Sequence, residues 1–471
     1  MTLLATQGTG MNSQIFREYD IRGIVAQDLC GAVPELIGRA FGSELRERNA
    51  GRADLTVVLG GDNRPSSPAL RQSVSQGVRA AGANVIDIGT VPTPVLYYAA
   101  ATIPADAGIQ ITGSHNPPEY NGIKLLSGGR PFYGEAIQRL QQRIEGGRFT
   151  QGAGERESRD IIPGYITDIA ARFRLSRPIR VVVDCGNGVG SLVAVDLLRA
   201  IGAEVIPLYC ESDGTFPNHH PDPTVDAYIQ DMIARVRETG AGLGVAFDGD
   251  ADRLGAVDER GVVVRGDLLL LLFALDTMQR LGAPQNLVFD VKCSQAVPEV
   301  YEAAGGKAIM WKTGHSLIKE KMKEVGAPIA GELSGHICYG NGYFGFDDAL
   351  YGACYLVQLC SELPGPLSHT VAEFPQYVST PEIRIEVTEE TKFGIVARAV
   401  AHFRERYQVV DVDGVRVLFD GGWGLLRASN TQPVLVARFE ARSAERLGEI
   451  QQVMADWLAG EGVKLEDSNH H

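Results

Sequence analysis

The sequence has few cysteines and no C-x-x-C pair among them. The seven are widely spaced, which is typical of neither a zinc-binding motif nor a disulfide framework. We therefore expect reduced, mostly buried thiols in a cytoplasmic protein. The cysteines are Cys30, Cys185, Cys210, Cys293, Cys338, Cys354 and Cys360.

Long hydrophobic runs are also missing. The longest spans only residues 268–275, whereas roughly 20 apolar residues are needed to cross a bilayer. The N-terminus lacks the basic and then apolar pattern of a signal peptide. We therefore expect a soluble cytoplasmic protein without a membrane partner.

Positive charge is in deficit. The 44 Lys and Arg residues face 58 Asp and Glu residues, which gives a net charge of −14. This balance excludes broad nucleic-acid binding, because no basic surplus exists to neutralise phosphates. A small anionic ligand, which needs only a local cluster of cations, stays possible.

The 471 residues are too many for one core and suggest three or four domains. One pattern occurs three times: an apolar strand, a polar or glycine-rich turn, a helical segment, a second turn and another strand. Such units predict right-handed parallel crossovers in α/β layers. The first strands are predicted at residues 55–59, 179–183 and 287–289.

The pattern changes after residue 374. Residues 382–387 alternate with period two, as a half-buried strand does. A helix at 392–406, strands near 414–419 and 434–440, and a last helix at 443–458 follow. We therefore predict an α/β protein with three related mixed α/β domains and a C-terminal α+β domain. The predicted boundaries are 1–160, 161–264, 265–374 and 375–471.

The run Thr112-Gly113-Ser114-His115-Asn116-Pro117 places one serine on a tight turn after a short apolar strand. Gly113 can take backbone angles closed to other residues, and the prolines that follow end regular pairing. His115 and Lys124 supply basic neighbours. The pattern indicates a nucleophile or phosphate carrier, although an ordinary serine-rich turn would look similar in isolation.

Three carboxylates alternate in Asp248-Gly249-Asp250-Ala251-Asp252-Arg253, after an apolar strand. They would repel one another without a cation between them. Oxygen ligands favour a hard divalent ion, in particular Mg²⁺ beside a phosphoryl group. A solvated acidic turn is one alternative. A calcium EF-hand is another, but its sixth position is Arg253 where that loop needs glycine.

Four shorter motifs are weaker signals. Each would also suit a polar surface loop, and a lone histidine or lysine is unremarkable at the end of a strand. They contain Tyr19 and Arg22; Lys292 and His315; Glu332, Ser334 and His336; and Arg427, Ser429, Asn430 and Thr431.

In this order, the motifs resemble those of the α-D-phosphohexomutase family, specifically its bacterial phosphomannomutase/phosphoglucomutase branch. Residues 112–117 match the family's phosphoserine loop, and 248–253 its magnesium loop. Residues 332–336 match its sugar-specificity loop, and 427–431 its phosphate-binding loop. The resemblance covers nearly the whole chain and implies four domains around a central active-site cleft, each with one of these loops.

The resemblance implies reversible phosphoryl transfer between O1 and O6 of a hexose phosphate through a phosphoserine and a hexose 1,6-bisphosphate. Glucose 1,6-bisphosphate is the implied activator and Mg²⁺ the cofactor, held by Ser114, Asp248, Asp250 and Asp252. The implied catalytic residues are Ser114, His115, Lys124, Arg22, Arg253, Lys292 and His315, of which Lys292 and His315 are acid/base candidates. The implied substrate ligands are Tyr19, Glu332, Ser334, His336, Arg427, Ser429, Asn430 and Thr431.

The preferred sugar stays open, because mannose and glucose differ at O2 and no residue is seen to distinguish them. Phosphoglucosamine mutases share most of these motifs. Leu333, however, is closer in character to the methionine of dual mannose/glucose enzymes than to the polar residues of other branches. A magnesium-dependent phosphatase and a non-catalytic sensor are further alternatives. We expect a monomer or small homo-oligomer that begins at Met1 or Met11 and binds small hexose phosphates.

Overall fold

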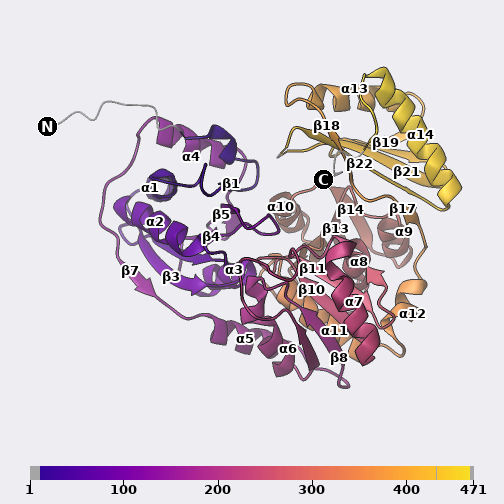
Figure 1. The fold of residues 1–471 in the computed structure, drawn as a ribbon, viewed down its shortest axis with the longest axis horizontal. Coiled ribbons are helices and arrows are strands. Elements are labelled where there is room, and N and C mark those ends of the chain that lie inside the picture. Colours follow the sequence, from indigo (N-terminus) through magenta and orange to yellow (C-terminus); the bar gives the residue numbers. More distant parts are fainter. Residues whose placement is uncertain (1–10, 431, 467–471) are drawn as a thin grey trace. The chain divides into compact units, whose positions relative to one another are not determined.

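The computed structural model describes residues 11–430 and 432–466. These residues form two compact units. The first contains the described residues up to 265 together with 335–368, and the second contains 266–334 and the described residues from 369 onward. Thr431 and Met1 lie outside the described residues. Figure 1 shows the order of the elements along the chain.

The first unit begins with a mixed sheet. Its strands are β1 (Ile21–Ile24), β2 (Thr56–Gly61), β3 (Asn84–Thr90), β4 (Ala107–Ile111), β5 (Tyr120–Ser127), β6 (Arg130–Pro131) and β7 (Arg156–Ser158). The strand order is β1-β5-β4-β2-β3-β7, with β6 paired to β5. Strand β2 is parallel to β3 and β4, whereas β5 is antiparallel to β4. The first predicted strand and its parallel crossover are confirmed.

Helices pack closely against this sheet. They are η1 (Ser13–Ile15), α1 (Val33–Arg48), α2 (Ser67–Ala80), α3 (Thr93–Thr102) and α4 (Glu135–Glu145). Between α1 and α2, a Cβ atom on Gly77 would lie 2.0 Å from the carbonyl oxygen of Glu35. Only glycine permits this approach, which helps to bury a continuous apolar core over the strands.

A second sheet in the same unit has the order β12-β11-β10-β8-β9. The strands are β8 (Arg180–Asp184), β9 (Glu204–Leu208), β10 (Leu243–Phe247), β11 (Leu254–Asp258) and β12 (Val263–Val264). Strand β8 is parallel to β9, as the second repeat predicts, and also to β10. The unit also contains α5 (Ile162–Ala170), η2 (Val189–Leu192), α6 (Ala194–Ala200), η3 (Asp226–Ile229), α7 (Gln230–Thr239), β16 (Ile337–Tyr339) and α11 (Ala349–Glu362).

The second unit contains the third repeat. Strand β13 pairs in parallel with β14 and β15, which confirms the third crossover. The elements are α8 (Gly266–Leu281), β13 (Asn286–Asp290), α9 (Ala296–Ala303), β14 (Lys307–Trp311), α10 (His315–Val325) and β15 (Ile329–Gly331). Helix α12 (Leu367–Ala372) precedes the C-terminal domain.

The C-terminal domain has an antiparallel sheet, as predicted, in the order β17-β22-β21-β20-β19 with β18 paired to β22. Figure 1 shows α13 and α14 on the same face of this sheet. The elements are β17 (Val378–Ser379), β18 (Ile383–Glu386), α13 (Lys392–Arg404), β19 (Gln408–Val410), β20 (Val415–Phe419), β21 (Gly422–Ala428), β22 (Val434–Ala441) and α14 (Ala444–Gly460).

The predicted fold class is therefore confirmed: three α/β domains and a C-terminal domain with an antiparallel sheet. The domain boundaries given above stay predictions. Among the described residues, no helix combines the length and apolar character needed to span a bilayer.

Candidate functional site

Ser114 lies on the turn between β4 and β5. Its φ of 50° falls in the left-handed region, which a non-glycine residue keeps only where its surroundings enforce it. The side chain is almost buried, and Oγ lies 3.0 Å from Asp248 Oδ2 and 3.2 Å from His115 Nδ1. A single hydroxyl hydrogen can be donated to either acceptor, but not fully to both.

A buried arginine, which the motif analysis misses, holds this turn. The side chain of Arg64 is 0% exposed, and its Nε pairs with Asp62 Oδ2 at 3.1 Å. Asp62 also accepts from the Gly113 amide at 3.0 Å. A Cβ atom on Gly113 would lie 2.4 Å from Arg64 Cζ, so this position requires glycine. The guanidinium donates to the carbonyl oxygens of Ser114 (2.7 Å), Asn116 (2.6 Å), Pro117 (2.5 Å) and Tyr120 (3.1 Å).

The three aspartates lie on the loop between β10 and β11, and each is 0% exposed. One oxygen from each of Asp248, Asp250 and Asp252 lies within 4.8 Å of the other two. The loop is tightly wound: Ala251 has φ of 60°, and the amides of Asp252 and Arg253 both donate to Asp248 Oδ1 at 3.1 Å. The strands on both sides argue against an EF-hand, whose loop joins two helices.

Lys124 on β5 contacts two of these carboxylates. Its Nζ lies 2.8 Å from Asp250 Oδ2 and 2.5 Å from Asp252 Oδ2. Burial alone would lower the pKa of Lys124, but the two carboxylates outweigh it and raise the pKa well above its usual value. Lys124 is therefore protonated at neutral pH. Thr93, a residue that the sequence does not single out, also donates to Asp250 Oδ2, at 2.5 Å.

The acidic loop fits a hard divalent cation. Burial, together with the charges of Asp250 and Asp252, raises the pKa of Asp248 well above its usual value. Lys124 offsets one of the three negative charges. Asp250 Oδ1 is buried and has no hydrogen-bond partner. An oxygen-only donor set with such an atom is the kind that Mg²⁺ prefers.

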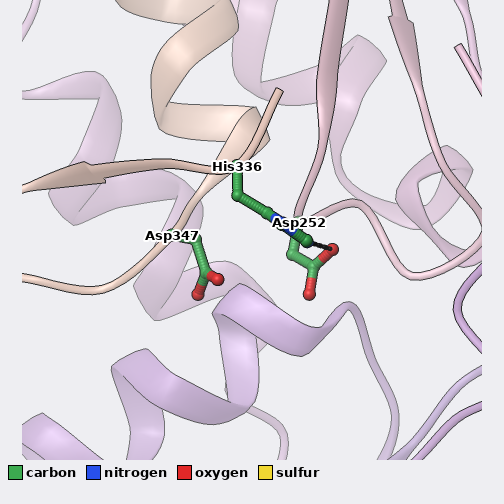
Figure 2. A group of neighbouring side chains, drawn as sticks. All are labelled: Asp252, His336 and Asp347. Atoms are coloured by element: carbon green, nitrogen blue, oxygen red, sulfur yellow. Dashed lines mark hydrogen bonds and ion pairs between the residues drawn. The ribbon is translucent and has the colours of Figure 1, made fainter. Parts of the chain in front are cut away.

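His336 connects the acidic loop to a further carboxylate. Its Nε2 lies 3.0 Å from Asp252 Oδ1 and 3.3 Å from Arg253 Nε. Because one ring nitrogen carries at most one hydrogen, Nε2 either donates to Asp252 or accepts from Arg253. Figure 2 shows the carboxylate of Asp347 beside this pair, and all three ligand atoms lie within 4.8 Å of one another. Asp347 belongs to no local motif, so the sequence gives no signal for it.

Two basic residues lie near the serine turn. Arg22 on β1 donates to Asn116 Oδ1 at 3.1 Å and pairs with Asp20 at 2.5 Å. Tyr19, one of the predicted substrate ligands, is half-buried. Burial, followed by the positive charges of Arg253 and Arg22, lowers the pKa of His115 well below its usual value. The His115 imidazole is therefore neutral at pH 7 and can accept a proton.

A second group of predicted residues lies in the second unit. Lys292 follows β13, and its Nζ lies 2.6 Å from Glu382 Oε1. Burial opposes both charges, but the attraction between them wins: the pKa of Lys292 is raised and that of Glu382 is lowered to about 2. Both side chains are therefore ionised at neutral pH. Glu382 is a further residue that the motif analysis misses.

His315 and Glu332 belong to the same group. His315 begins α10, and Glu332 Oε1 accepts from the amide of the preceding Gly314 at 2.6 Å. Ser334, two residues along, is half-buried. The Glu332 carboxylate and the histidine are thus held at one end of parallel strands, where α/β folds commonly bind ligands.

Asp413, which the sequence does not mark, joins this group to Arg427. Its Oδ2 accepts from the Thr313 amide and from Arg427 Nε, both at 3.0 Å. Ser429, at the end of β21, is buried, whereas Asn430 is exposed. Thr431, the last predicted phosphate ligand, lies outside the described residues.

Comparison with known proteins places all four parts of the chain in one family. The family models for phosphoglucomutase/phosphomannomutase match as α/β/α domain I at residues 13–151, domain II at 163–261, domain III at 265–377 and the C-terminal domain at 382–456. The chain belongs to this family, the α-D-phosphohexomutases, and is an enzyme of that class.

Individual relatives agree with this assignment. A phosphomannomutase/phosphoglucomutase from Pseudomonas aeruginosa is 46% identical over 448 residues, which cover 95% of this chain and 96% of that protein. A phosphoglucomutase from Neisseria gonorrhoeae is 42% identical over 442 residues, which cover 93% of this chain and 95% of that protein. The crystal structure of a phosphoglucomutase/phosphomannomutase family protein from Burkholderia thailandensis has a TM-score of 0.90 at 40% identity, over 97% of this chain and 99% of that one.

Proposed function

We propose that this enzyme reversibly transfers a phosphoryl group between O1 and O6 of mannose and glucose phosphates in the cytoplasm. The observation that carries the proposal is the position of Ser114 Oγ, 3.0 Å from Asp248 Oδ2 at the edge of a buried acidic loop. A serine in that position suits a phosphoryl carrier beside a metal site. The 46% identity to a phosphomannomutase/phosphoglucomutase supports the choice of sugars.

The cycle begins with phosphate on Ser114, which passes to the sugar and gives a bound hexose 1,6-bisphosphate. The intermediate then reorients, and its other phosphoryl group returns to the serine. In that second transfer the Ser114 hydroxyl must lose its proton as the O–P bond forms. His115 Nδ1, at 3.2 Å and on a neutral ring, is our candidate acceptor for this proton.

Asp248, Asp250 and Asp252, together with an oxygen on Ser114, would hold the Mg²⁺ ion. When bound, the ion supplies positive charge that stabilises the transferring phosphoryl group. Lys124, Arg22 and Arg253 add fixed positive charge near the same serine. The raised pKa of Lys124 keeps that charge present throughout the neutral range.

We propose that residues of the second group bind the sugar and its other phosphate, with Glu332 and Ser334 as ligands of the O3 and O4 hydroxyls. Tyr19 and His336, which belong to the first unit, are further candidate substrate ligands. Arg427, Ser429, Asn430 and Thr431 would hold the phosphate that is not reacting. His315 and Lys292 are the acid/base candidates for the sugar hydroxyl.

The protonation of Lys292 limits what it can do. Its raised pKa keeps the amine protonated next to Glu382 at neutral pH. In that state Lys292 can donate a proton or stabilise negative charge, but it cannot accept a proton. His315 is then the better candidate for the base.

The experiment is a product assay with glucose 1-phosphate, mannose 1-phosphate and glucosamine 1-phosphate, each with Mg²⁺ and a trace of glucose 1,6-bisphosphate. We expect the 6-phosphates of glucose and mannose, with little free phosphate. A preference for glucosamine would indicate a phosphoglucosamine mutase, and release of free phosphate a phosphatase. No turnover of any sugar by protein that carries phosphoserine would favour a non-catalytic sensor.

A further inference from the structure

Two cysteine sulfurs are in contact in the first unit. Cys185 directly follows β8, and Cys210 lies just beyond the end of β9, the strand parallel to it. Their Sγ atoms are 3.2 Å apart, and a hydrogen bond joins the two thiols. A disulfide needs about 2.0 Å between the sulfurs, so bonding requires a movement of roughly 1 Å. Both residues are free thiols in this structure.

The two thiols differ in access and acidity. Cys185 is buried, whereas Cys210 is partly exposed. The hydrogen bond to Cys210, with burial second, raises the pKa of Cys185 well above its usual value. The same hydrogen bond lowers the pKa of Cys210. The more accessible sulfur is therefore the more readily ionised one, which is the arrangement of an attacking thiol with a resolving partner.

The segments that carry these cysteines are linked to the serine turn through His219 and His220. The carboxylate of Asp184, the residue before Cys185, lies 3.1 Å from His219 Nε2. The ring of Tyr209, the residue before Cys210, packs edge-on against His219. His220, the residue after His219, donates from Nε2 to the carbonyl oxygen of His115. His115 directly follows Ser114 in the serine turn.

A second connection runs through Asn187. Its amide donates to the carbonyl oxygen of Tyr209 at 2.8 Å, and its own carbonyl oxygen accepts from Asn63 Nδ2 at 2.7 Å. Asn63 lies between Asp62 and Arg64, the pair that holds the serine turn. Two sets of hydrogen bonds therefore connect the cysteine-bearing segments with the serine turn.

We propose that Cys185 and Cys210 form a reversible disulfide under peroxide and that this bond slows the transferase reaction; the effect on rate rests on the function proposed above. The Cys210 thiolate attacks hydrogen peroxide, forming a sulfenic acid and releasing hydroxide, which takes up a proton to become water. The Cys185 sulfur then displaces a second water as the S–S bond forms. In total, two thiols and one peroxide give one disulfide and two waters, and a dithiol reductant reverses the change.

The test treats the purified full-length protein with hydrogen peroxide, alkylates the remaining thiols and maps peptides without reduction. Exposed Cys30 serves as an internal measure of oxidant exposure. We expect a Cys185–Cys210 cross-link and a fall in kcat of roughly tenfold or more, since displacements of about 1 Å near reacting groups have effects of this size. Dithiothreitol should restore the rate.

The matched variants are Cys210→Ser, which removes the attacking thiol, and Cys354→Ser, which removes a buried cysteine of α11. Cys210→Ser should keep its rate under peroxide, whereas Cys354→Ser should lose it as the wild type does. Absence of the cross-link when Cys30 is fully oxidised would overturn the proposal, as would equal loss of rate in both variants. Cross-linking without a change in rate would overturn the regulatory part. The peptide map needs no activity, so it separates this proposal from the proposed function.

Discussion

The guanidinium of Arg64 donates to the carbonyl oxygen of Ser114 at 2.7 Å, from a side chain that is entirely buried. The contact joins the turn after β2 to the turn after β4, two parallel strands of one sheet. Arg64 touches the backbone of the serine and not its hydroxyl. It is therefore a positioning residue, and it holds Ser114 at a positive φ that the residue would not otherwise favour.

Replacing Arg64 with lysine should keep the charge but lose part of this support, because lysine has three donors where arginine has five. We expect the free energy of unfolding to fall by about 2–4 kcal/mol, measured by urea denaturation. We also expect kcat to fall by roughly tenfold or more, with less change in KM. The control is Arg260→Lys, whose exposed side chain pairs with Asp258. Equal behaviour of the two variants would contradict this role.

Ser114→Ala should abolish a phosphate-bearing species. Intact mass of purified wild-type protein should show a fraction heavier by one phosphate, which shifts to the lighter form with substrate. The alanine variant should show only the light form and lose most turnover, since nothing else in the proposed cycle carries the group. Unphosphorylated wild type should regain activity with glucose 1,6-bisphosphate. A variant with near-normal turnover would refute the assignment of Ser114.

The predictable and unpredictable parts of the site differ in how their residues lie along the chain. The acidic loop could be found because Asp248, Asp250 and Asp252 alternate directly after one strand. Arg64 and Asp347 could not be assigned roles, because each acts on residues distant in sequence, through backbone carbonyls or a shared histidine. Arg64 has one weak local signal, since Asp62 and Arg64 follow a parallel strand, where α/β sheets place functional groups.

The fold was easier to predict, because its signals are local and repeated. Short apolar runs bounded by turn residues located β2, β8 and β13 to within about two residues. After Leu59, a bulge shifts the register between β2 and β3. No local sequence pattern predicts this bulge, because it depends on how both strands pair.

Activity should require a divalent metal, and Asp250→Asn should impair it strongly. The buried carboxylates repel one another, and the variant removes one charge and alters the atom without a partner. Without metal, the melting temperature should change less than turnover does, because the variant relieves repulsion between carboxylates but also weakens the ion pair with Lys124. Turnover in Mg²⁺ and in a chelator, with melting curves for both proteins, provides the measurement. Undiminished wild-type turnover in chelator would remove the metal from the mechanism.

Asp348 should make stability depend on pH in the direction opposite to most carboxylates. Burial raises its pKa from 3.8 to about 6, although hydrogen bonds from Tyr343, the Tyr351 amide and Tyr165 oppose the shift. The folded state therefore binds the proton more tightly than the unfolded state. As pH rises from about 4 to 7, Asp348 should lower the free energy of unfolding by about 3 kcal/mol in total.

Asp348→Asn removes the titrating group and keeps an acceptor at the start of α11. As pH rises through this window, the unfolding free energy of the variant should therefore increase relative to that of the wild type. Urea midpoints at pH 5 and pH 8 provide the measurement. Parallel pH profiles for the two proteins would show that Asp348 titrates normally.

Arg427→Ala should weaken the hold on the phosphate that is not reacting. The side chain is nearly buried and is oriented by Asp413 at 3.0 Å, so its guanidinium is fixed before substrate arrives. Loss of a charge-assisted contact of about 1.5–3 kcal/mol should raise KM by roughly one to two orders of magnitude. The control is Arg384→Ala, a partly exposed arginine of the same sheet that contacts Gln432.

The same variant should release more intermediate. In the proposed cycle the hexose 1,6-bisphosphate must turn around without leaving, and a mobile C-terminal domain that carries Arg427 would hold its distal phosphate in both orientations. We therefore expect Arg427→Ala to release more free bisphosphate per turnover than the wild type or Arg384→Ala. The measurement is a trap for released bisphosphate during steady-state turnover. If KM and release are both unchanged, Arg427 does not hold the phosphate, and the cation for that role must be sought elsewhere.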